Sequence, residues 1–417
     1  MRPLLLFTCS FCFLNLLHAQ DTTQQIVTGR KNQATQIQKP YLILISADGF
    51  RYDYAAKYNA KDLQALAKSG VAAKSMLPSY PSVTFPNHYT VATGMYPSHH
   101  GLVYNQFYDR NRKATYNMSD RKAVEDGSWY GGVPIWVLAE QQGMLSASYH
   151  FVGTEAPVQG VLPTYWYKFS DKIPIEQRIK RVVDWLQLPE AERPHFISFY
   201  MSNTDHAGHM YGPYAKETEE ATQFVNDAVA KLYSEVSKLN LPVNFIFLAD
   251  HGMAAVDTVN RIDLYKQIDT AQFVIRGGGT SLHLYAKDPS FIQPMYTQLK
   301  ANAKDYYVYL KNEAPASWHY SAADDVFNRI GDIFIAPKYP LTLNGAGRRI
   351  SPGAHGYDPA MPQMHASFYA WGPAFKKGLV IDSFENIHVY PLMARILGLN
   401  YQHKIDGKPE VLKQILK

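Results

Sequence analysis

Carboxylate and imidazole side chains recur in three short segments of this sequence at spacings that suit a metal site. Asp205 and His209 would share one face of a helical turn, because positions i and i+4 do so. Asp250 and His251 are adjacent, and His355 stands next to a glycine in a loop-like segment. Oxygen and nitrogen ligands without sulfur suit Zn²⁺. With an acidic residue from the segment Ala-Asp-Gly, the candidate ligands are Asp48, Asp205, His209, Asp250, His251 and His355.

Six such ligands could supply three side chains to each of two ions. That number matches catalytic two-metal sites, in which one ion activates the nucleophile and both ions clamp a transferring phosphoryl group.

Thr84 is the candidate nucleophile. Pro86 suits the first turn of a helix that residues 87–93 can continue, so Thr84 falls at or near a helix N-terminus. Free backbone N–H groups and the helix dipole favour an anion there. A threonine that only caps the helix is the simpler interpretation of this stretch in isolation. The six candidate ligands favour the nucleophile, because a hydroxyl bound to Zn²⁺ loses its proton more easily.

Three apolar runs end just before the carboxylates and would position them. Each predicts a strand buried on both faces, as in a parallel sheet. Apolar residues at three- and four-residue spacing predict helices over residues 60–69, 175–188 and 217–239. Alternating strands and helices predict an α/β fold with a largely parallel central sheet flanked by helices, with the site at the carboxyl ends of the strands. The three runs are residues 41–46, 196–201 and 244–249.

Residues 1–19 predict a cleaved secretory signal, with a basic start, an apolar stretch and a small residue at Ala19. The stretch is shorter than the roughly 20 residues of a membrane span, so no stable membrane anchor is expected. Both cysteines, Cys9 and Cys12, lie within it. A secreted chain that keeps no cysteine favours a bacterial periplasm or exterior over an animal extracellular space.

The rest of the chain divides into a polar, flexible leader over residues 20–39 and a catalytic region over 40–417. Within the latter, residues 255–350 are rich in Gly, Pro and Tyr and could form a smaller inserted subdomain. The net charge of +5 without a basic block, and 18% charged residues, argue against disorder and against binding of a nucleic-acid duplex. A small-molecule partner is expected, and the oligomeric state is left open.

Several motifs occur in one order over about residues 40–400, and together they resemble a known family. The sequence is similar to the nucleotide pyrophosphatase/phosphodiesterases, also called autotaxin-like ectonucleotide phosphodiesterases, of the alkaline phosphatase superfamily. The matching segments are residues 47–49, 84–88, 92–94 with Pro97, 100–105, 205–213, 250–253 and 355–356.

This resemblance implies an alkaline-phosphatase-like fold and a secreted enzyme with two Zn²⁺ ions. Such an enzyme would hydrolyse a small-molecule phosphodiester, either a nucleotide diester or a pyrophosphate, to a nucleoside monophosphate through a covalent Thr84 intermediate. The resemblance also divides the ligands. The ion that activates Thr84 would be held by Asp48, Asp250 and His251, and the second ion by Asp205, His209 and His355.

For the substrate, the resemblance implies that Asn105 donates to a phosphate oxygen, although its residue type alone suggests a turn. Phe85 would pack against the base, opposite a second ring from residues 165–169, with Trp166 and Tyr167 as candidates and core packing as the alternative. Residues 150–153 depart from the aromatic-Pro-Gly pattern of animal members. The lack of cysteines after the predicted signal and of further domains also departs from them, so a single catalytic domain of bacterial type is expected.

Other functions are weighed against this one. Choline-bearing lipids or glycerophosphodiesters are the alternative substrates within the family. A monoesterase would pair a serine with an arginine, and the sequence near Thr84 has no arginine. A sulfatase needs a cysteine or serine at that position. A non-catalytic metal-binding protein would have lost at least one of the candidate ligands, and all six are present.

Overall fold

A nine-stranded mixed sheet forms the centre of the protein, as seen in a computed structural model that describes residues 22–417. The three predicted apolar runs form its middle strands, and every residue of these strands is buried. Across the sheet the order is β1 (Gln24–Ile26), β8 (Tyr165–Tyr167), β7 (Ser146–Tyr149), β9 (Phe196–Met201), β2 (Tyr41–Ala47), β10 (Val243–Leu248), β17 (Phe368–Trp371), β3 (Val71–Ala73) and β18 (Leu379–Ile381).

The central neighbours β8, β7, β9, β2 and β10 are all parallel to one another. Antiparallel pairs lie on either side, β1 with β8 at one edge and β17 with both β10 and β3 toward the other. The α/β prediction is confirmed, with a mixed sheet whose centre is parallel. Because the middle strands are parallel, their carboxyl ends meet at one edge of the sheet.

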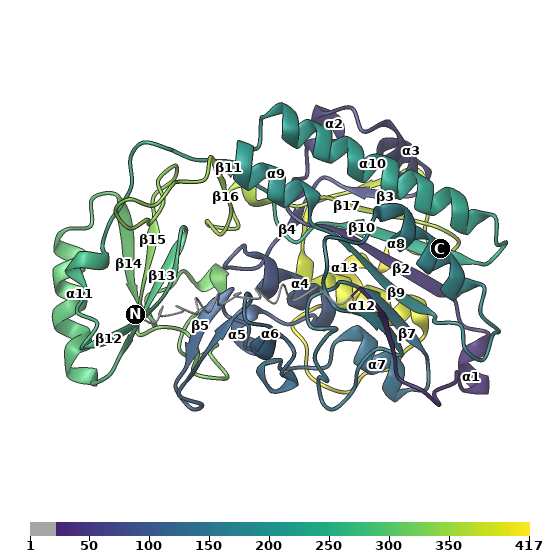
Figure 1. Cartoon of the computed structure of the whole chain (residues 1–417), viewed down its shortest axis with the longest axis horizontal. Helices are drawn as coiled ribbons and strands as arrows, with labels where there is room; N and C mark the ends of the chain where they lie inside the picture. The colour runs from purple at the N-terminus through teal and green to yellow at the C-terminus, as the bar shows by residue number, and fades with distance from the viewer. Residues whose placement is uncertain (1–21) are drawn as a thin grey trace, which may run out of the picture.

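Helices cover both faces of this sheet (Figure 1). Helices α3 (Lys61–Ser69), α8 (Ile175–Leu186) and α10 (Lys216–Ser237) lie on one face, within three residues of their predicted bounds. Helices α4 (Thr84–Thr93), α7 (Ile135–Gln141) and α12 (Val389–Leu397) lie on the other. The remaining α-helices are α1 (Ala34–Ile37), α2 (Tyr54–Lys57), α5 (Pro97–His100), α6 (Arg121–Val124), α9 (Asn203–Tyr211), α11 (Ile292–Ala301) and α13 (Pro409–Lys413).

A second, four-stranded sheet forms a small lobe at one end of the molecule (Figure 1). All its neighbouring strands are antiparallel, and α11 packs on it. Its apolar side chains, from Ile262 to Leu343, make a core separate from that of the main sheet. The lobe lies within the predicted inserted region, residues 255–350. In order, its strands are β12 (Phe273–Gly278), β13 (Ser281–Ala286), β15 (Ile333–Pro337) and β14 (Tyr306–Leu310).

Three short strand pairs complete the described structure. They are β11 (Ala254–Ala255) with β16 (Gly353–Ala354), β4 (Met76–Leu77) with β19 (Phe384–Glu385), and β5 (Gln106–Asp109) with β6 (Ala114–Asn117).

The segment predicted as a flexible leader is part of the fold over its described residues, 22–39. Strand β1 pairs with β8, and the side-chain amide of Asn32 donates to the main-chain oxygens of Glu190 and Arg193. Composition did not reveal this, because edge-strand pairing uses main-chain groups that every sequence carries. The predicted signal, residues 1–19, lies outside the described residues. Among residues 22–417, no helix has the length and apolar character of a bilayer span.

Candidate active site

The three candidate carboxylates meet at the carboxyl edge of the main sheet. Asp48 follows β2, Asp250 follows β10, and Asp205 lies in the first turn of α9, just after β9. Gly49 allows this close approach. Its φ is +66°, and a Cβ there would stand 3.0 Å from the Cα of Asp205. The Gly49 N–H also donates to Asp250 Oδ1 at 3.1 Å, which fixes one oxygen of that carboxylate.

One predicted ligand group, Asp48, Asp250 and His251, is fully buried and compact. His251 Nε2 lies 3.0 Å from Asp250 Oδ2 and 3.5 Å from the Asp48 side-chain oxygen Oδ1. The other Asp48 oxygen, Oδ2, accepts a 2.5 Å hydrogen bond from the hydroxyl of Tyr200. Asp48 therefore has one oxygen held by the protein and one facing the cluster.

The other predicted group, Asp205, His209 and His355, lies beside it. Asp205 Oδ1 is 3.3 Å from His209 Nε2 and 3.5 Å from His355 Nε2, and the two imidazole Nε2 atoms are 3.0 Å apart. Asp205 and His209 stand four residues apart on α9, as the spacing predicted. The rings of His251 and His355 stack at 3.5 Å, so the two groups adjoin.

All three histidines are oriented by main-chain carbonyls. The Nδ1 atom of His251 lies 2.8 Å from Gly252 O, that of His209 lies 2.9 Å from Gly353 O, and that of His355 lies 2.9 Å from Ser82 O. Since a carbonyl only accepts, each Nδ1 carries a proton, and each Nε2 faces the cluster. Such outer hydrogen bonds are usual for histidines that bind metal.

The cluster fits metal ions because its polar atoms lack other partners. Within residues 22–417, three buried oxygens, Asp48 Oδ1, Asp205 Oδ1 and Asp250 Oδ2, make no hydrogen bond, although histidine nitrogens lie near them. Burial and the charges of Asp250 and Asp205 raise the pKa of Asp48 well above its usual range. Within the group Asp48, Asp250 and His251, one ligand atom from each residue lies within 4.8 Å of the other two. The same holds within the group Asp205, His251 and His355. Clustered carboxylate oxygens and imidazole nitrogens are a suitable environment for divalent cations.

Thr84 is the first residue of α4, and its side chain faces the cluster. The residue that caps the helix is Val83, and no side chain makes a capping hydrogen bond there. The Thr84 hydroxyl lies instead 3.2 Å from His251 Nε2. The structure therefore does not favour the capping interpretation, and it places the hydroxyl next to the first group of ligands.

Asn105 lies against the same helix end. Its Oδ1 accepts the Phe85 N–H at 3.0 Å, one of the amides that a first helical turn leaves unpaired. This bond holds the side-chain amide of Asn105 against the first turn of α4, next to the residue that follows Thr84. The NH₂ group of Asn105 makes no hydrogen bond within residues 22–417.

His88 is a residue of this site that the sequence analysis did not assign. It is fully buried, one helical turn after Thr84, and its Nδ1 lies 3.0 Å from Thr84 O and 3.2 Å from Asp250 Oδ2. Its Nε2 lies 2.8 Å from Ser46 Oγ, which can donate to it. His88 thus ties the nucleophile helix to a candidate ligand. The i, i+4 spacing from Thr84 was the signal that could have revealed it.

A cavity of about 260 Å³ opens beside Thr84, and aromatic side chains form part of its wall. Phe85 and Phe169 both line it, and Phe169 is 38% exposed. Trp166 and Tyr167 do not line it, which corrects the predicted substrate contacts. They belong to buried strand β8, where Tyr167 stacks on Tyr149 at 4.5 Å. Pairing of β8 on both sides within the sheet holds these two rings in the core, and Phe169 comes just after the strand ends.

Two charged residues of this wall were also not predicted. Arg121 lines the cavity and forms ion pairs with Glu155 and Glu125. Glu155 also accepts the N–H of Phe169 at 3.1 Å. The structure thus brings an arginine near Thr84 that is remote in the sequence, but two carboxylates already neutralise it.

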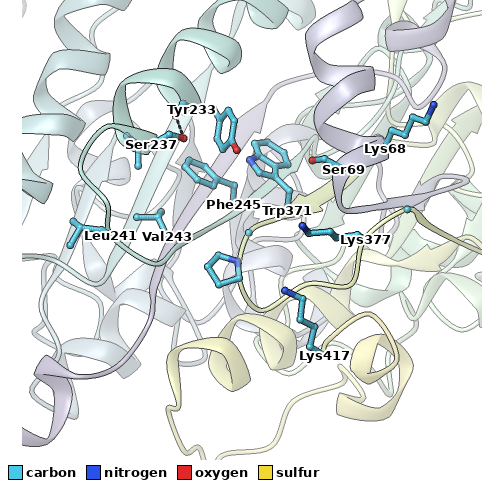
Figure 2. A pocket seen from close by; sticks show the side chains of 14 residues that line it. Lys68, Ser69, Tyr233, Ser237, Leu241, Val243, Phe245, Trp371, Lys377 and Lys417 are labelled. Atoms are coloured by element: carbon cyan, nitrogen blue, oxygen red, sulfur yellow. Dashed lines mark hydrogen bonds between the residues drawn. The ribbon is translucent and has the colours of Figure 1, made fainter.

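A larger hollow, of about 750 Å³, lies at the opposite edge of the sheet (Figure 2). Val243 and Phe245, at the amino end of β10, line it together with Trp371. Exposed Lys68, Lys377 and Lys417 surround it, and it includes none of the candidate ligands or the nucleophile.

The fold and the position of this cluster define a protein of the alkaline phosphatase superfamily. Within it, the chain belongs to the type I phosphodiesterase/nucleotide pyrophosphatase family, whose model matches residues 42–358. It is 34% identical to human ectonucleotide pyrophosphatase/phosphodiesterase family member 1, over 86% of this chain and 40% of that protein. It is 34% identical to the venom phosphodiesterase CdcPDE of Crotalus durissus collilineatus, over 90% of this chain and 46% of that protein.

An uncharacterised pyrophosphatase/phosphodiesterase of Schizosaccharomyces pombe is 32% identical, over 94% of this chain and 82% of that protein. The chain thus spans less than half the length of the human and snake relatives. Among solved structures, murine ectonucleotide pyrophosphatase/phosphodiesterase 5 matches with a TM-score of 0.84 at 24% identity, over 90% of this chain and all of that chain. The human form matches with the same TM-score at 25% identity, over 90% of this chain and 99% of that chain. These likenesses support the fold.

Proposed function

We propose that this protein is a secreted, zinc-dependent phosphodiesterase that hydrolyses nucleotide diesters or pyrophosphates to nucleoside monophosphates. The observation that carries this proposal is the position of Thr84. Its hydroxyl stands 3.2 Å from His251 at a helix N-terminus, beside two groups of candidate ligands and at the mouth of a cavity with aromatic walls.

In the first half-reaction, Thr84 Oγ1 attacks phosphorus. A new O–P bond forms to Thr84 Oγ1, whose proton passes to solvent, and the bond from phosphorus to the leaving oxygen breaks with the electron pair staying on that oxygen, so that the nucleoside phosphoryl group becomes an ester of Thr84. In the second, a water oxygen bonds to the same phosphorus and gives up a proton, the bond from phosphorus to Thr84 Oγ1 breaks, Oγ1 takes up a proton again, and a nucleoside monophosphate leaves. The free donor of Asn105 binds a non-bridging phosphate oxygen as its charge increases.

Two Zn²⁺ ions would be held by Asp48, Asp250 and His251 and by Asp205, His209 and His355. When bound, such ions lower the pKa of a bound hydroxyl or water and neutralise phosphate charge. The protein prepares this arrangement, since main-chain carbonyls fix all three imidazoles with Nε2 facing inward.

The cavity wall favours a nucleoside over a choline group. A quaternary ammonium is usually recognised by aromatic faces together with a free negative charge. Apart from candidate ligands Asp48 and Asp205, Glu155 is the one acidic side chain among the described lining residues, and Arg121 neutralises it. Phe85 and Phe169 offer flat, partly exposed rings on which a base can stack.

The test combines metal content with substrate choice. Purified protein should contain about two zinc ions per chain and should cleave p-nitrophenyl thymidine 5′-phosphate far faster than p-nitrophenyl phosphate or p-nitrophenyl phosphocholine. A chelator should abolish activity and lower the melting temperature by several degrees, because the carboxylates then repel one another uncompensated. Faster monoester turnover, or full activity without zinc, would contradict the proposal.

A further inference from the structure

The candidate ligands face two different cavities. Thr84, Asp48 and Asp205 line the cavity of about 260 Å³ described above. His209 and His355 line a second cavity of about 250 Å³. A phosphorus atom held between the two groups would therefore direct its two substituents into different cavities.

The small lobe supplies much of the second cavity's wall. One part comes from Gly278, Gly279 and Thr280, at the turn between β12 and β13, and another from Thr342, Asn344 and residues 349–351. Asn105 lines this cavity as well, so the donor assigned to the phosphate borders it.

Glycine makes this turn possible and brings its main chain close to the site. Gly278 and Gly279 have φ values of +143° and +66°, which side-chain-bearing residues rarely adopt. The turn is then fixed by two main-chain hydrogen bonds between Gly279 and Leu343, of 2.9 and 2.7 Å. The Thr280 hydroxyl donates to the carbonyl of His355 at 2.8 Å. The lobe is thus tied directly to a candidate metal ligand.

The second cavity is polar and carries a free positive charge. Arg349 is exposed at its wall and forms no ion pair with any carboxylate in residues 22–417. No acidic side chain is among the described residues that line the cavity. The first cavity differs in both respects. Its Arg121 is neutralised by Glu125 and Glu155, and acidic side chains are among its lining residues. An unpaired guanidinium beside main-chain and hydroxyl groups suits a phosphate group.

We propose that the small lobe forms a leaving-group subsite in which Arg349 binds the phosphates of a pyrophosphate-linked substrate. This inference rests on the proposed function. A nucleoside triphosphate would place its nucleoside at Phe85 and Phe169 and its β- and γ-phosphates against Arg349. Attack by Thr84 on the α-phosphorus breaks the bond from the α-phosphorus to the bridging oxygen, and pyrophosphate leaves with that oxygen and the bonding electron pair. Arg349 neutralises part of the charge that the leaving group gains.

The test compares two substrates with the same nucleoside half. Thymidine 5′-triphosphate releases pyrophosphate, whereas p-nitrophenyl thymidine 5′-phosphate releases a leaving group without phosphate. Arg349→Ala should lower kcat/KM for the triphosphate about tenfold or more, the usual loss for a hydrogen bond to a charged group. It should change kcat/KM for the nitrophenyl ester less than about twofold, since that leaving group offers no phosphate to pair with the guanidinium. Arg349→Lys, which keeps the charge, should recover part of the loss.

Arg348→Ala is the matched control, because Arg348 is the exposed neighbour and does not line the cavity. It should leave both substrates unaffected. An unchanged triphosphate rate in Arg349→Ala, or an equal fall for both substrates, would overturn the leaving-group subsite while the proposed function stands. A wild-type protein that cleaves neither substrate would overturn the proposed function, and the subsite with it.

Discussion

The two ends of strand β10 open onto hollows of different character. At its carboxyl end, Asp250 and His251 belong to a buried polar cluster beside a cavity of about 260 Å³. At its amino end, Phe245 stacks on Trp371 at 5.3 Å and lines a hollow of about 750 Å³. The larger hollow is thus the one without ligands or nucleophile.

Buried polar atoms distinguish the two ends better than volume does. At the carboxyl end, three carboxylate oxygens that make no hydrogen bond in the described residues converge, and a bound cation would stabilise such a group. Among the described residues that line the hollow at the amino end, Trp371 Nε1 is the one buried polar side-chain atom without a hydrogen-bond partner. One unpaired indole costs little compared with three converging carboxylates, so the carboxyl end is the one built for a ligand.

The largest effect on catalysis is expected when the nucleophile at the carboxyl end is removed. Thr84→Ala should lower kcat for p-nitrophenyl thymidine 5′-phosphate about 10³-fold or more, because no covalent intermediate can form. Zinc content and melting temperature should stay near those of the wild type, since the six carboxylate and imidazole ligands would still hold both ions without the Thr84 hydroxyl. Thr84→Ser should keep a measurable rate. A Thr84→Ala variant with more than a tenth of the wild-type rate would remove Thr84 from the reaction.

A smaller effect is expected at the wall of the carboxyl-end cavity. Phe169→Ala should raise KM for the thymidine ester roughly threefold to tenfold, the range expected for loss of one ring-stacking contact. Trp166→Phe should leave KM nearly unchanged and lower the melting temperature, because Trp166 is a core residue of β8. A raised KM in Trp166→Phe together with an unchanged KM in Phe169→Ala would instead support the substrate contact first predicted for Trp166.

The smallest effect is expected at the amino end. Lys377→Ala, at the rim of the larger hollow, should change kcat/KM for the thymidine ester less than about twofold. Its charge is exposed, and salt screens exposed charges over about 10 Å. Steady-state kinetics at physiological ionic strength is the measurement. A large change would mean that the two ends of the sheet are energetically coupled.

The sequence predicted the central strands and the long helices well, because continuous apolar runs and 3.6-residue periodicity report burial directly. It also pointed to the six side chains that converge, since each carboxylate follows a strand or lies in the turn just after one. It was wrong about the leader, because β1 is held by main-chain pairing with β8. The sequence analysis also proposed Trp166 and Tyr167 as the ring opposite Phe85, whereas Phe169 is the residue of that aromatic run that lines the cavity. Composition does not tell which rings of an aromatic run remain inside the sheet.

The sequence by itself therefore determined the chemistry available to this protein: carboxylates and imidazoles past strand ends, a threonine before a helix, and no thiol among the candidate groups. Residue type and local spacing are sufficient for that. Only the tertiary structure decided which groups share a space. It placed Arg121, from a distant segment, in the wall of the cavity that Thr84 lines and neutralised it there. It also left Arg349 without an ion pair to any described residue, in the wall of the cavity that His355 lines. Such pairings depend on segments far apart in the chain, and no local pattern records them.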